Sequence, residues 1–253
     1  MPNDWFRFKQ FLIRQDRTAM KVGTDGVLLG VWAGTGHPAR ILDIGTGTGL
    51  VSLMLAQRFP EAIIDALEID PESALQAQEN AGLSSWGERI RVIQADFLQW
   101  APDGKYDLIV SNPPFFRRSL PSPDAARNRA RHDRSLPLDG LITGSSGMLE
   151  PGGGLSLVIP IQRLPEVVTA IGRAGLLLNR ITRVRGTPAS PVKRLLIHLG
   201  RSTAPPEISE LVIEMQPGSF SEEFRGLIEE FYLESSSSVN LIPCSSSSVR
   251  IGR

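Results

Sequence analysis

The chain has 253 residues, 41% of them hydrophobic, which is enough for one sizeable α/β core. Lys plus Arg equals Asp plus Glu at 27 each, so a nucleic-acid partner would need a local basic patch rather than net charge. A single cysteine and three dispersed histidines exclude a disulfide framework and a Cys-rich zinc site. Because signal-peptide and membrane-spanning patterns are lacking, we expect a cytoplasmic protein with no membrane partner. We also expect it to hold no metal and to be a monomer.

The first predicted elements are two short strand pieces in residues 5–13, where large apolar side chains alternate with polar ones. We expect residues 1–23 to form a lid or strand segment of the main domain. Residues 23–26 then place helix-capping side chains before an apolar run. This pattern predicts a helix that starts near Thr24 or Asp25.

Strand-like and helix-like stretches alternate along the rest of the chain, which predicts a mostly parallel sheet covered on both faces. The strand candidates are residues 40–44, 63–68, 90–95, 106–111, 154–159, 180–185 and 194–199. The helical stretches between them are residues 50–58, 71–81, 138–149 and 164–174. The Gly and Pro punctuation between the last two strands predicts that they pair antiparallel.

A further strand candidate at 207–215 and a final helix at 221–233 complete one domain, which we expect to span residues 1–233. Residues 234–253 contain two runs of four serines and show no periodicity. We expect this stretch to be a disordered tail.

Residues 41–49 form an apolar strand that carries an acid near its end and then turns through glycines into a helix. Gly45 and Gly47 let the backbone approach a ligand at the carboxyl end of the strand. Their spacing is not that of dinucleotide-binding loops, and Asp43 would repel a pyrophosphate. Asp43 suits instead the cationic methionine end of S-adenosylmethionine, and we place Thr46 in the same binding site.

Two further acids close the next two predicted strands. Glu68 stands about 20 residues after the glycines, where a carboxylate can accept both hydrogens of a ribose diol. Asp96, with Phe97 beside it, follows the third strand and is placed to contact the amine and the face of the cofactor's adenine. Acids at strand ends also occur simply as turn formers. Three on successive strands nevertheless predict a cofactor site.

The fourth predicted strand runs into the loop Asn112-Pro113-Pro114-Phe115. An exocyclic amine such as adenine N6 is a poor nucleophile, so an enzyme must hold both of its N–H bonds. The Asn112 side-chain oxygen and the Pro113 carbonyl can each accept one, Pro114 helps to stiffen the loop, and Phe115 can stack on the base. Positioning, worth roughly 7 to 11 kcal/mol, outweighs two hydrogen bonds of about 1 kcal/mol each. In isolation the same loop would be a plain strand terminator.

A local basic stretch follows this loop, where the phosphates next to a bound nucleotide would lie. The residues predicted to bind RNA there are Arg117, Arg118, Arg127, Arg129, Arg131 and His132. Lys21 is a further candidate for RNA contact, although a plain surface lysine fits the sequence equally well.

The chain resembles the bacterial tRNA1(Val) adenine-N6 methyltransferases, which belong to the class I methyltransferases with an Asn-Pro-Pro-aromatic motif. The resemblance rests on residues 8–11, 16–17 and 20–30 together with both loops, and covers most of residues 6–233. It implies a three-layer Rossmann-like fold with a seven-stranded sheet and an antiparallel last strand. It also implies S-adenosylmethionine as methyl donor and adenine 37 of a valine tRNA as target. The cofactor and catalytic set that it implies is Asp43, Gly45, Gly47, Glu68, Asp96 and Asn112.

Four other interpretations stay open. A protein-glutamine N5 methyltransferase would present the same NH2 group to Asn112 and Pro113, and an rRNA guanine-N2 methyltransferase is equally compatible with the loop. The basic stretch, and a short N-terminus without a separate helical domain, favour RNA over a glutamine side chain. Asp43 and the glycine spacing disfavour a nicotinamide-dependent oxidoreductase. The intact loop at 112–115 disfavours a non-catalytic RNA-binding module.

Overall fold

The apolar strands pair into one eight-stranded sheet with the order β10-β8-β9-β7-β6-β3-β4-β5. We describe residues 3–18, 20–34, 36–114 and 136–233 of a computed structural model. The strands of this sheet are β3 (Arg40–Ile44), β4 (Ile63–Glu68), β5 (Ile90–Gln94), β6 (Tyr106–Ser111), β7 (Leu149–Pro160), β8 (Leu177–Arg185), β9 (Val192–Gly200) and β10 (Glu207–Val212). Within this sheet, every neighbouring pair is parallel except the two that β9 makes with β7 and β8.

The prediction of seven strands was wrong by one. Residues 207–212 join the sheet as its edge strand β10, parallel to β8, and Leu211 pairs there with Val184. Leu211 is buried, so the added strand extends the core, and it covers an edge of β8 that would otherwise leave backbone groups unpaired. The predicted antiparallel hairpin is confirmed as β8 and β9, with β9 inside the sheet.

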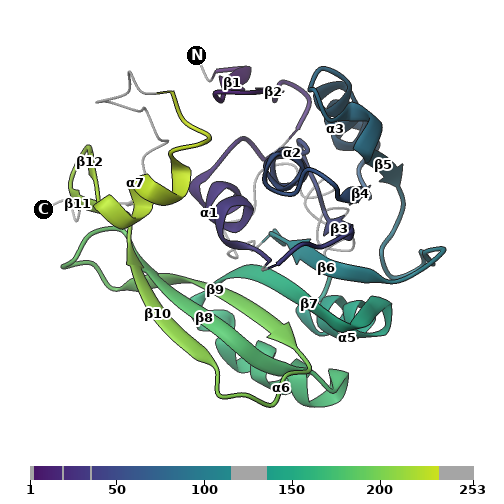
Figure 1. The fold of residues 1–253 in the computed structure, drawn as a ribbon, viewed down its shortest axis with the longest axis vertical. Helices are drawn as coiled ribbons and strands as arrows, with labels where there is room; N and C mark the ends of the chain where they lie inside the picture. The colour runs from purple at the N-terminus through teal and green to yellow at the C-terminus, as the bar shows by residue number, and fades with distance from the viewer. Residues whose placement is uncertain (1–2, 19, 35, 115–135, 234–253) are drawn as a thin grey trace, which may run out of the picture.

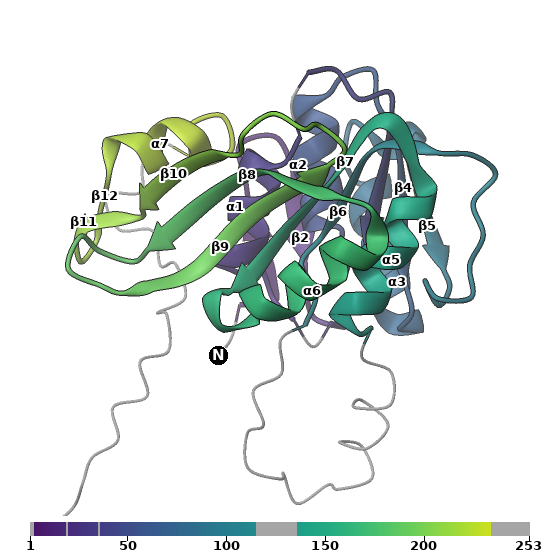
Figure 2. The ribbon, with the colours of Figure 1, turned by 90° about the horizontal axis from the view of Figure 1, so that it is seen from below.

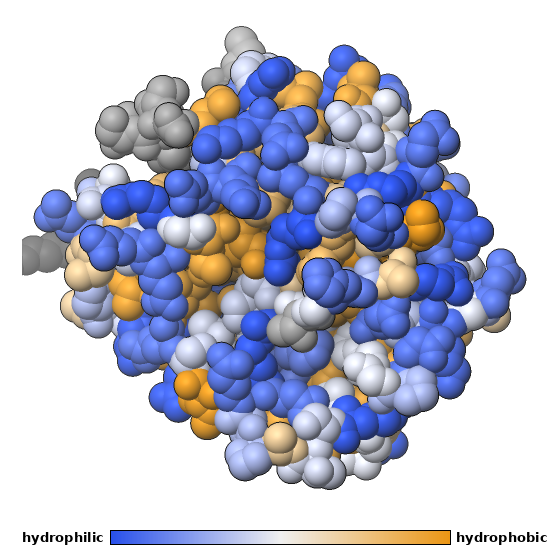
Figure 3. Space-filling view, viewed as in Figure 1, coloured by the Kyte–Doolittle hydropathy of each residue, from blue (hydrophilic) through white to orange (hydrophobic). Residues whose placement is uncertain are grey.

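Helices cover both faces of the sheet (Figure 1, Figure 2). One face carries α1 (Thr24–Trp32), α2 (Leu50–Arg58), α3 (Pro71–Gly82) and the short α7 (Glu222–Ile228). The other carries α5 (Leu138–Met148) and α6 (Leu164–Ala174). Single 3-10 turns lie at Gly87–Arg89 and Ile161–Arg163. In the view of Figure 1, the surface is largely hydrophilic, with apolar side chains visible mainly toward the middle (Figure 3).

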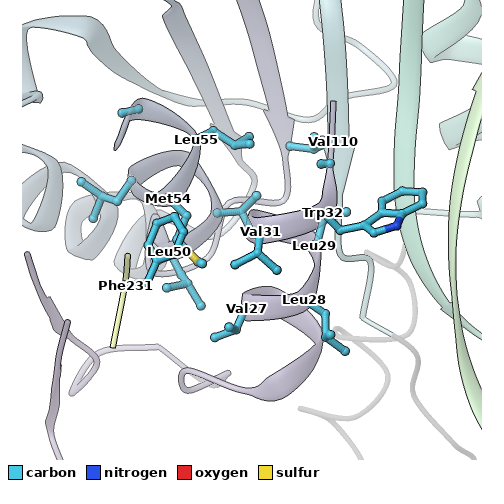
Figure 4. Close-up of a cluster of buried hydrophobic side chains, with 14 of the residues drawn as sticks. Val27, Leu28, Leu29, Val31, Trp32, Leu50, Met54, Leu55, Val110 and Phe231 are labelled. Carbon is cyan, nitrogen blue, oxygen red and sulfur yellow. The ribbon is translucent and has the colours of Figure 1, made fainter. Parts of the chain in front are cut away.

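Successive residues of the central strands point to opposite faces and therefore fill two separate cores. Ile41 lies in the core beneath α1 and α2, whereas Leu42 lies in the core beneath α5. Figure 4 shows the first core, where side chains of α1 lie among those of α2, with Val110 from β6 and Phe231 from the end of the described chain. Helix α1 is buried from Gly26 to Trp32, which explains why its sequence is apolar all round.

Helices α1 and α2 approach closely because α1 carries glycine at two positions on one face. A Cβ on Gly30 would lie 2.5 Å from the Met54 sulfur, and a Cβ on Gly26 would lie 3.1 Å from Cδ2 of Leu50. Larger side chains there would push the helices apart. Part of the 20–30 block therefore serves helix packing.

The N-terminal segment folds back onto the end of the described chain. Strands β1 (Trp5–Arg7) and β2 (Leu12–Arg14) form the two predicted strand pieces, paired as a hairpin. Phe8 is fully buried, and its ring lies 4.5 Å from that of Phe11 and 5.5 Å from that of Tyr232. The Lys9 N–H donates to the Phe231 carbonyl at 2.7 Å. Whether the segment acts as a lid stays a prediction.

The final helix is shorter than predicted. Ser221 caps α7 by accepting from the Phe224 N–H at 3.0 Å, but the helix ends at Ile228 rather than near residue 233. The prediction was wrong because Phe231 and Tyr232 leave the helix to pack against the N-terminal aromatic rings. A small hairpin of β11 (Glu214–Gln216) and β12 (Ser219–Phe220) precedes α7. The predicted tail, residues 234–253, lies outside the described residues.

Candidate active site

A cavity of about 300 Å³ opens at the carboxyl edge of the sheet, where α/β folds bind ligands. It brings together the ends of β3, β4, β5 and β6 with part of the N-terminal segment. The predicted site residues that line it are Gly45, Gly47, Glu68, Asp96, Phe97, Asn112, Pro113 and Pro114. Two side chains without a predicted role at the cofactor, Thr18 and Met20, line it as well.

The glycine loop exposes its backbone to this cavity. Gly45 and Gly47 have φ of 73° and 58°, which is the left-handed region where L side chains are strained. A Cβ on either residue would meet no protein atom within 4 Å. The loop is therefore a cradle in which a ligand, rather than a side chain, can occupy the space beside the backbone.

Asp43 is buried and does not itself line the cavity. Its Oδ2 accepts hydrogen bonds from the hydroxyls of Thr46 and Ser52, both at 2.7 Å. Burial raises the pKa of Asp43 to about 6, although the bonds from Thr46 and Ser52 pull it down in part. Thr46 does not line the cavity either. Both residues act on the shape of the loop, and Ser52 is a member of this network that the sequence analysis missed.

The two acids on the next strands hold turns and face the cavity at the same time. Glu68 accepts from the N–H groups of Gly47 and Asp70, each at 2.9 Å, and so ties the end of β4 to the glycine loop. Asp96 accepts from the Leu98 N–H at 3.0 Å. Both residues therefore stabilise turns, and both also line the cavity.

Phe97 borders the cavity from the side of the core beneath α5. Its side chain is 6% exposed. A Cβ on Gly144 of α5 would lie 2.9 Å from the Phe97 ring, so the helix makes room for the ring with a glycine. The ring is held between α5 and the ligand space.

The Asn-Pro-Pro loop leaves the sheet from a strand that is paired on both sides. The Ser111 hydroxyl donates to the Ile44 carbonyl at 2.7 Å and joins the ends of β6 and β3. Pro113 is buried and Pro114 exposed, and Asn112 Nδ2 would lie 3.9 Å from a Cβ on Gly26. Asn112 therefore follows directly after the joined ends of β6 and β3 and lies near α1.

The residues predicted to bind RNA are only partly covered by the structure. Phe115 and the basic stretch, Arg117, Arg118, Arg127, Arg129, Arg131 and His132, lie outside the described residues. Lys21 donates from Nζ to the Asn3 carbonyl at 3.1 Å and pairs with Asp4 at 3.5 Å, so its ammonium group lies at the start of the N-terminal hairpin.

Within the described residues, no group of three or more His, Cys, Asp or Glu side chains is arranged to hold a metal ion. In the same residues, no helix has both the length and the apolar character needed to cross a membrane.

Comparison with known proteins places this geometry in a family. The model of the "Methyltransferase small domain" family matches residues 23–165. Curated proteins named tRNA1(Val) (adenine(37)-N6)-methyltransferase, from Parabacteroides distasonis and Bacteroides thetaiotaomicron, are 46% and 47% identical to this chain. Each alignment covers 92% of this chain, and 100% and 99% of the respective relative. The chain belongs to the tRNA1(Val) adenine-N6 methyltransferase family.

A solved structure supports the fold of this family member. A "predicted O-methyltransferase" from Agrobacterium tumefaciens matches it with a TM-score of 0.65 at 23% identity, over 82% of this chain and 96% of its own. At that identity the likeness shows the fold alone. The predicted class of fold is confirmed, with one strand more than expected.

Proposed function

We propose that this protein transfers a methyl group from S-adenosylmethionine to the N6 amine of adenine 37 in the anticodon loop of a valine tRNA. The observation that carries the proposal is that the glycine loop and the Asn112-Pro113-Pro114 loop meet at one cavity. Membership in the family supports the same reaction, because a relative named tRNA1(Val) (adenine(37)-N6)-methyltransferase is 46% identical over 92% of this chain.

The β3 to β5 side of the cavity fits the cofactor. Gly45 and Gly47 leave the space beside the backbone open, and the Glu68 carboxylate is suited to a ribose diol. Asp96 and Phe97 offer an acceptor and an apolar face to an adenine. Bound there, S-adenosylmethionine supplies an electrophilic methyl group on a sulfonium. Asp43 acts through the loop, since its carboxylate fixes the hydroxyls of Thr46 and Ser52.

The β6 side of the cavity fits the amine that is methylated. The Asn112 side-chain oxygen and the Pro113 carbonyl each accept one N–H bond and so orient the nitrogen toward the methyl group. In the described part of the cavity lining, Glu68 and Asp96 are the only titratable side chains. A strong base is not needed because the donor is already cationic and the nitrogen can release its proton to water. Positioning, worth roughly 7 to 11 kcal/mol of barrier, is the main contribution of the chain.

The basic stretch from Arg117 to Arg134 and Lys21 are proposed to bind the phosphates next to the target. A double substitution, Arg129→Ala with Arg131→Ala, is expected to weaken RNA binding and flatten its salt dependence. We also propose that the protein works in the cytoplasm as a monomer. Light scattering after size exclusion would measure the mass in solution.

Radiolabelled S-adenosylmethionine and total tRNA from a strain that lacks the activity provide the test. After incubation with the purified protein, the RNA is digested to nucleosides and the labelled one is identified. We expect N6-methyladenosine. Label in co-incubated cell protein would point instead to glutamine methylation. Labelled N2-methylguanosine in a parallel incubation with rRNA would point to the guanine reaction.

A further inference from the structure

One wall of the cavity is formed in part by a short piece of chain between the N-terminal hairpin and α1. Residues 15–18 and 20–22, here called the strap, place Thr18 and Met20 in the cavity wall. The strap is closed on itself, because the Gln15 side-chain oxygen accepts from the Val22 N–H at 2.8 Å. The Thr18 hydroxyl donates to the Met20 carbonyl at 2.9 Å. Its shape is thus defined by its own polar side chains.

Two buried amide side chains of α3 hold the strap and the strand before it. The Gln76 side-chain oxygen accepts from the Arg17 N–H at 3.1 Å. Asn80 accepts from the Arg14 N–H at 2.8 Å and donates to the Arg14 carbonyl at 2.9 Å. Gln76 and Asn80 are both 0% exposed and lie one helical turn apart on the same face of α3.

Asn80 differs from Gln76 in one bond. Its Nδ2 also donates to the Thr48 carbonyl at 2.8 Å. Thr48 lies in the glycine loop between Gly47 and Gly49, whose φ values of 58° and 82° make this turn. Gln76 sends its Nε2 to Glu79 on its own helix, at 3.3 Å. Of these two residues, only Asn80 therefore forms hydrogen bonds both to the glycine loop and to Arg14, which precedes the strap.

We infer that Asn80 is a positioning residue that couples the glycine loop to the N-terminal chain that leads into the strap. The inference rests on the proposed function for the nature of the two ligands. A carboxamide has two N–H donors and one acceptor oxygen, and Asn80 uses all of them on backbone groups from two sides. When the cofactor orders the glycine loop, the shared amide orders Arg14 and the strap with it. Thr18 and Met20 are then set for the base only while the methyl donor is present.

Amide hydrogen exchange with and without S-adenosylhomocysteine tests the coupling without RNA. In the wild-type protein we expect saturation to slow exchange at the Arg17 and Val22 N–H groups by at least ~5-fold, the lower end of ordinary coupling. In Asn80→Ala this slowing of exchange, which we call the gain in protection, disappears. In the matched control Gln76→Ala, Arg17 exchanges faster at baseline but the gain at Val22 remains. Equal gains in wild type and Asn80→Ala, or no gain in wild type, would overturn the inference.

Asn80→Asp guards against a loss of folding in the alanine variant. In its ionised form it keeps the shape and the acceptor for the Arg14 N–H but donates to neither the Arg14 nor the Thr48 carbonyl, so the gain should again be lost. Melting temperatures show whether each variant is folded at the temperature of the exchange experiment. A folded Asn80→Asp protein with the wild-type gain would contradict the assignment.

Binding of tRNA gives a second readout. We expect S-adenosylhomocysteine to tighten tRNA binding by about 5-fold or more in wild type and in Gln76→Ala, and to leave it unchanged in Asn80→Ala. A wild-type protein that neither binds nor methylates tRNA would contradict the proposed function. The exchange experiment would then decide the role of Asn80 by itself.

Discussion

In the proposed reaction, Asn112 is the residue on which the chemistry depends most directly. Its side chain borders the cavity, so Asn112→Ala is expected to remove an acceptor for the amine and to leave the glycine loop intact. We expect kcat to fall by about 100-fold or more, the usual effect of losing one group that orients or stabilises the transition state. Affinity for S-adenosylhomocysteine, measured by calorimetry, should change little. Val168→Ala on the exposed face of α6 serves as the control, and near-normal turnover in Asn112→Ala would remove the proposed role.

Two buried residues give the molecule opposite responses to pH. Burial raises the pKa of Asp43 from 3.8 to about 6. The folded chain then binds this proton more tightly than the unfolded chain, so stability is fully present below pH 3.8 and is lost as pH rises through about 6. Burial, with a smaller effect of Arg180, lowers the pKa of His198 from 6.5 to about 4. Its contribution is present above pH 6.5 and is lost as pH falls through about 4.

Because the two windows overlap with opposite signs, we expect the contributions to offset each other in the wild-type protein. In Asp43→Asn the free energy of unfolding should rise from pH 4 to 6.5 by about 2 kcal/mol more than in wild type. In His198→Asn the free energy of unfolding should instead fall from pH 4 to 6.5, by a similar amount relative to wild type. Urea unfolding followed by circular dichroism at both pH values measures these slopes. A variant with the wild-type slope would show that its residue does not titrate as stated.

Among the elements, α1 and α6 offer a matched pair of helical glycines. Gly30→Ala would bring a Cβ to 2.5 Å from the Met54 sulfur, so we expect a loss of about 1 to 3 kcal/mol through overpacking. Gly172→Ala in α6 would meet nothing within 4 Å and should stabilise the protein by about 0.5 to 1 kcal/mol. Denaturant titration of both variants measures the difference. Similar effects at the two positions would show that α1 and α2 do not pack as closely as described.

Elements buried on both faces could be predicted well from sequence, and elements at the margins could not. Residues 40–44 and 106–111 were predicted to the residue because continuous apolar runs bounded by turn residues are typical of interior parallel strands. The place of β10 was missed because most of its side chains are exposed or only half-buried, so no apolar pattern marks it as part of the sheet. The end of α7 was missed because a contact with residues more than 200 positions away decides it.

At the scale of the whole molecule, one sheet separates two cores, and this arrangement predicts a single unfolding transition. Phe8→Ala empties space in the core beneath α1, and Leu141→Ala does so beneath α5. Each should lower the free energy of unfolding by about 2 to 5 kcal/mol. Calorimetry should show one transition that moves to lower temperature in both variants. Two separable transitions would contradict the expectation of one domain over residues 1–233.

The cofactor half of the site could be predicted from sequence and the strap could not. Glycines and acids at strand ends carry their chemistry in their residue types, and parallel pairing brings those ends together. Thr18 and Met20 carry no such signal, and the bonds within the strap and from Gln76 to Arg17 become visible only in the structure. Asp43 was predicted to meet the cofactor directly, but it is buried and its carboxylate contacts Thr46 and Ser52 instead.

The hydrogen bond between Lys9 and Phe231 joins two residues that are far apart in the order of synthesis. The ribosome must add 222 more residues after Lys9 before that bond can form, which takes roughly 10 to 45 s. Until then the first strands lack the aromatic partner that packs on Phe8. The contacts of the strap with α3 do not depend on this partner. A nascent chain therefore completes the packing of its N-terminal hairpin last, although that hairpin is translated first.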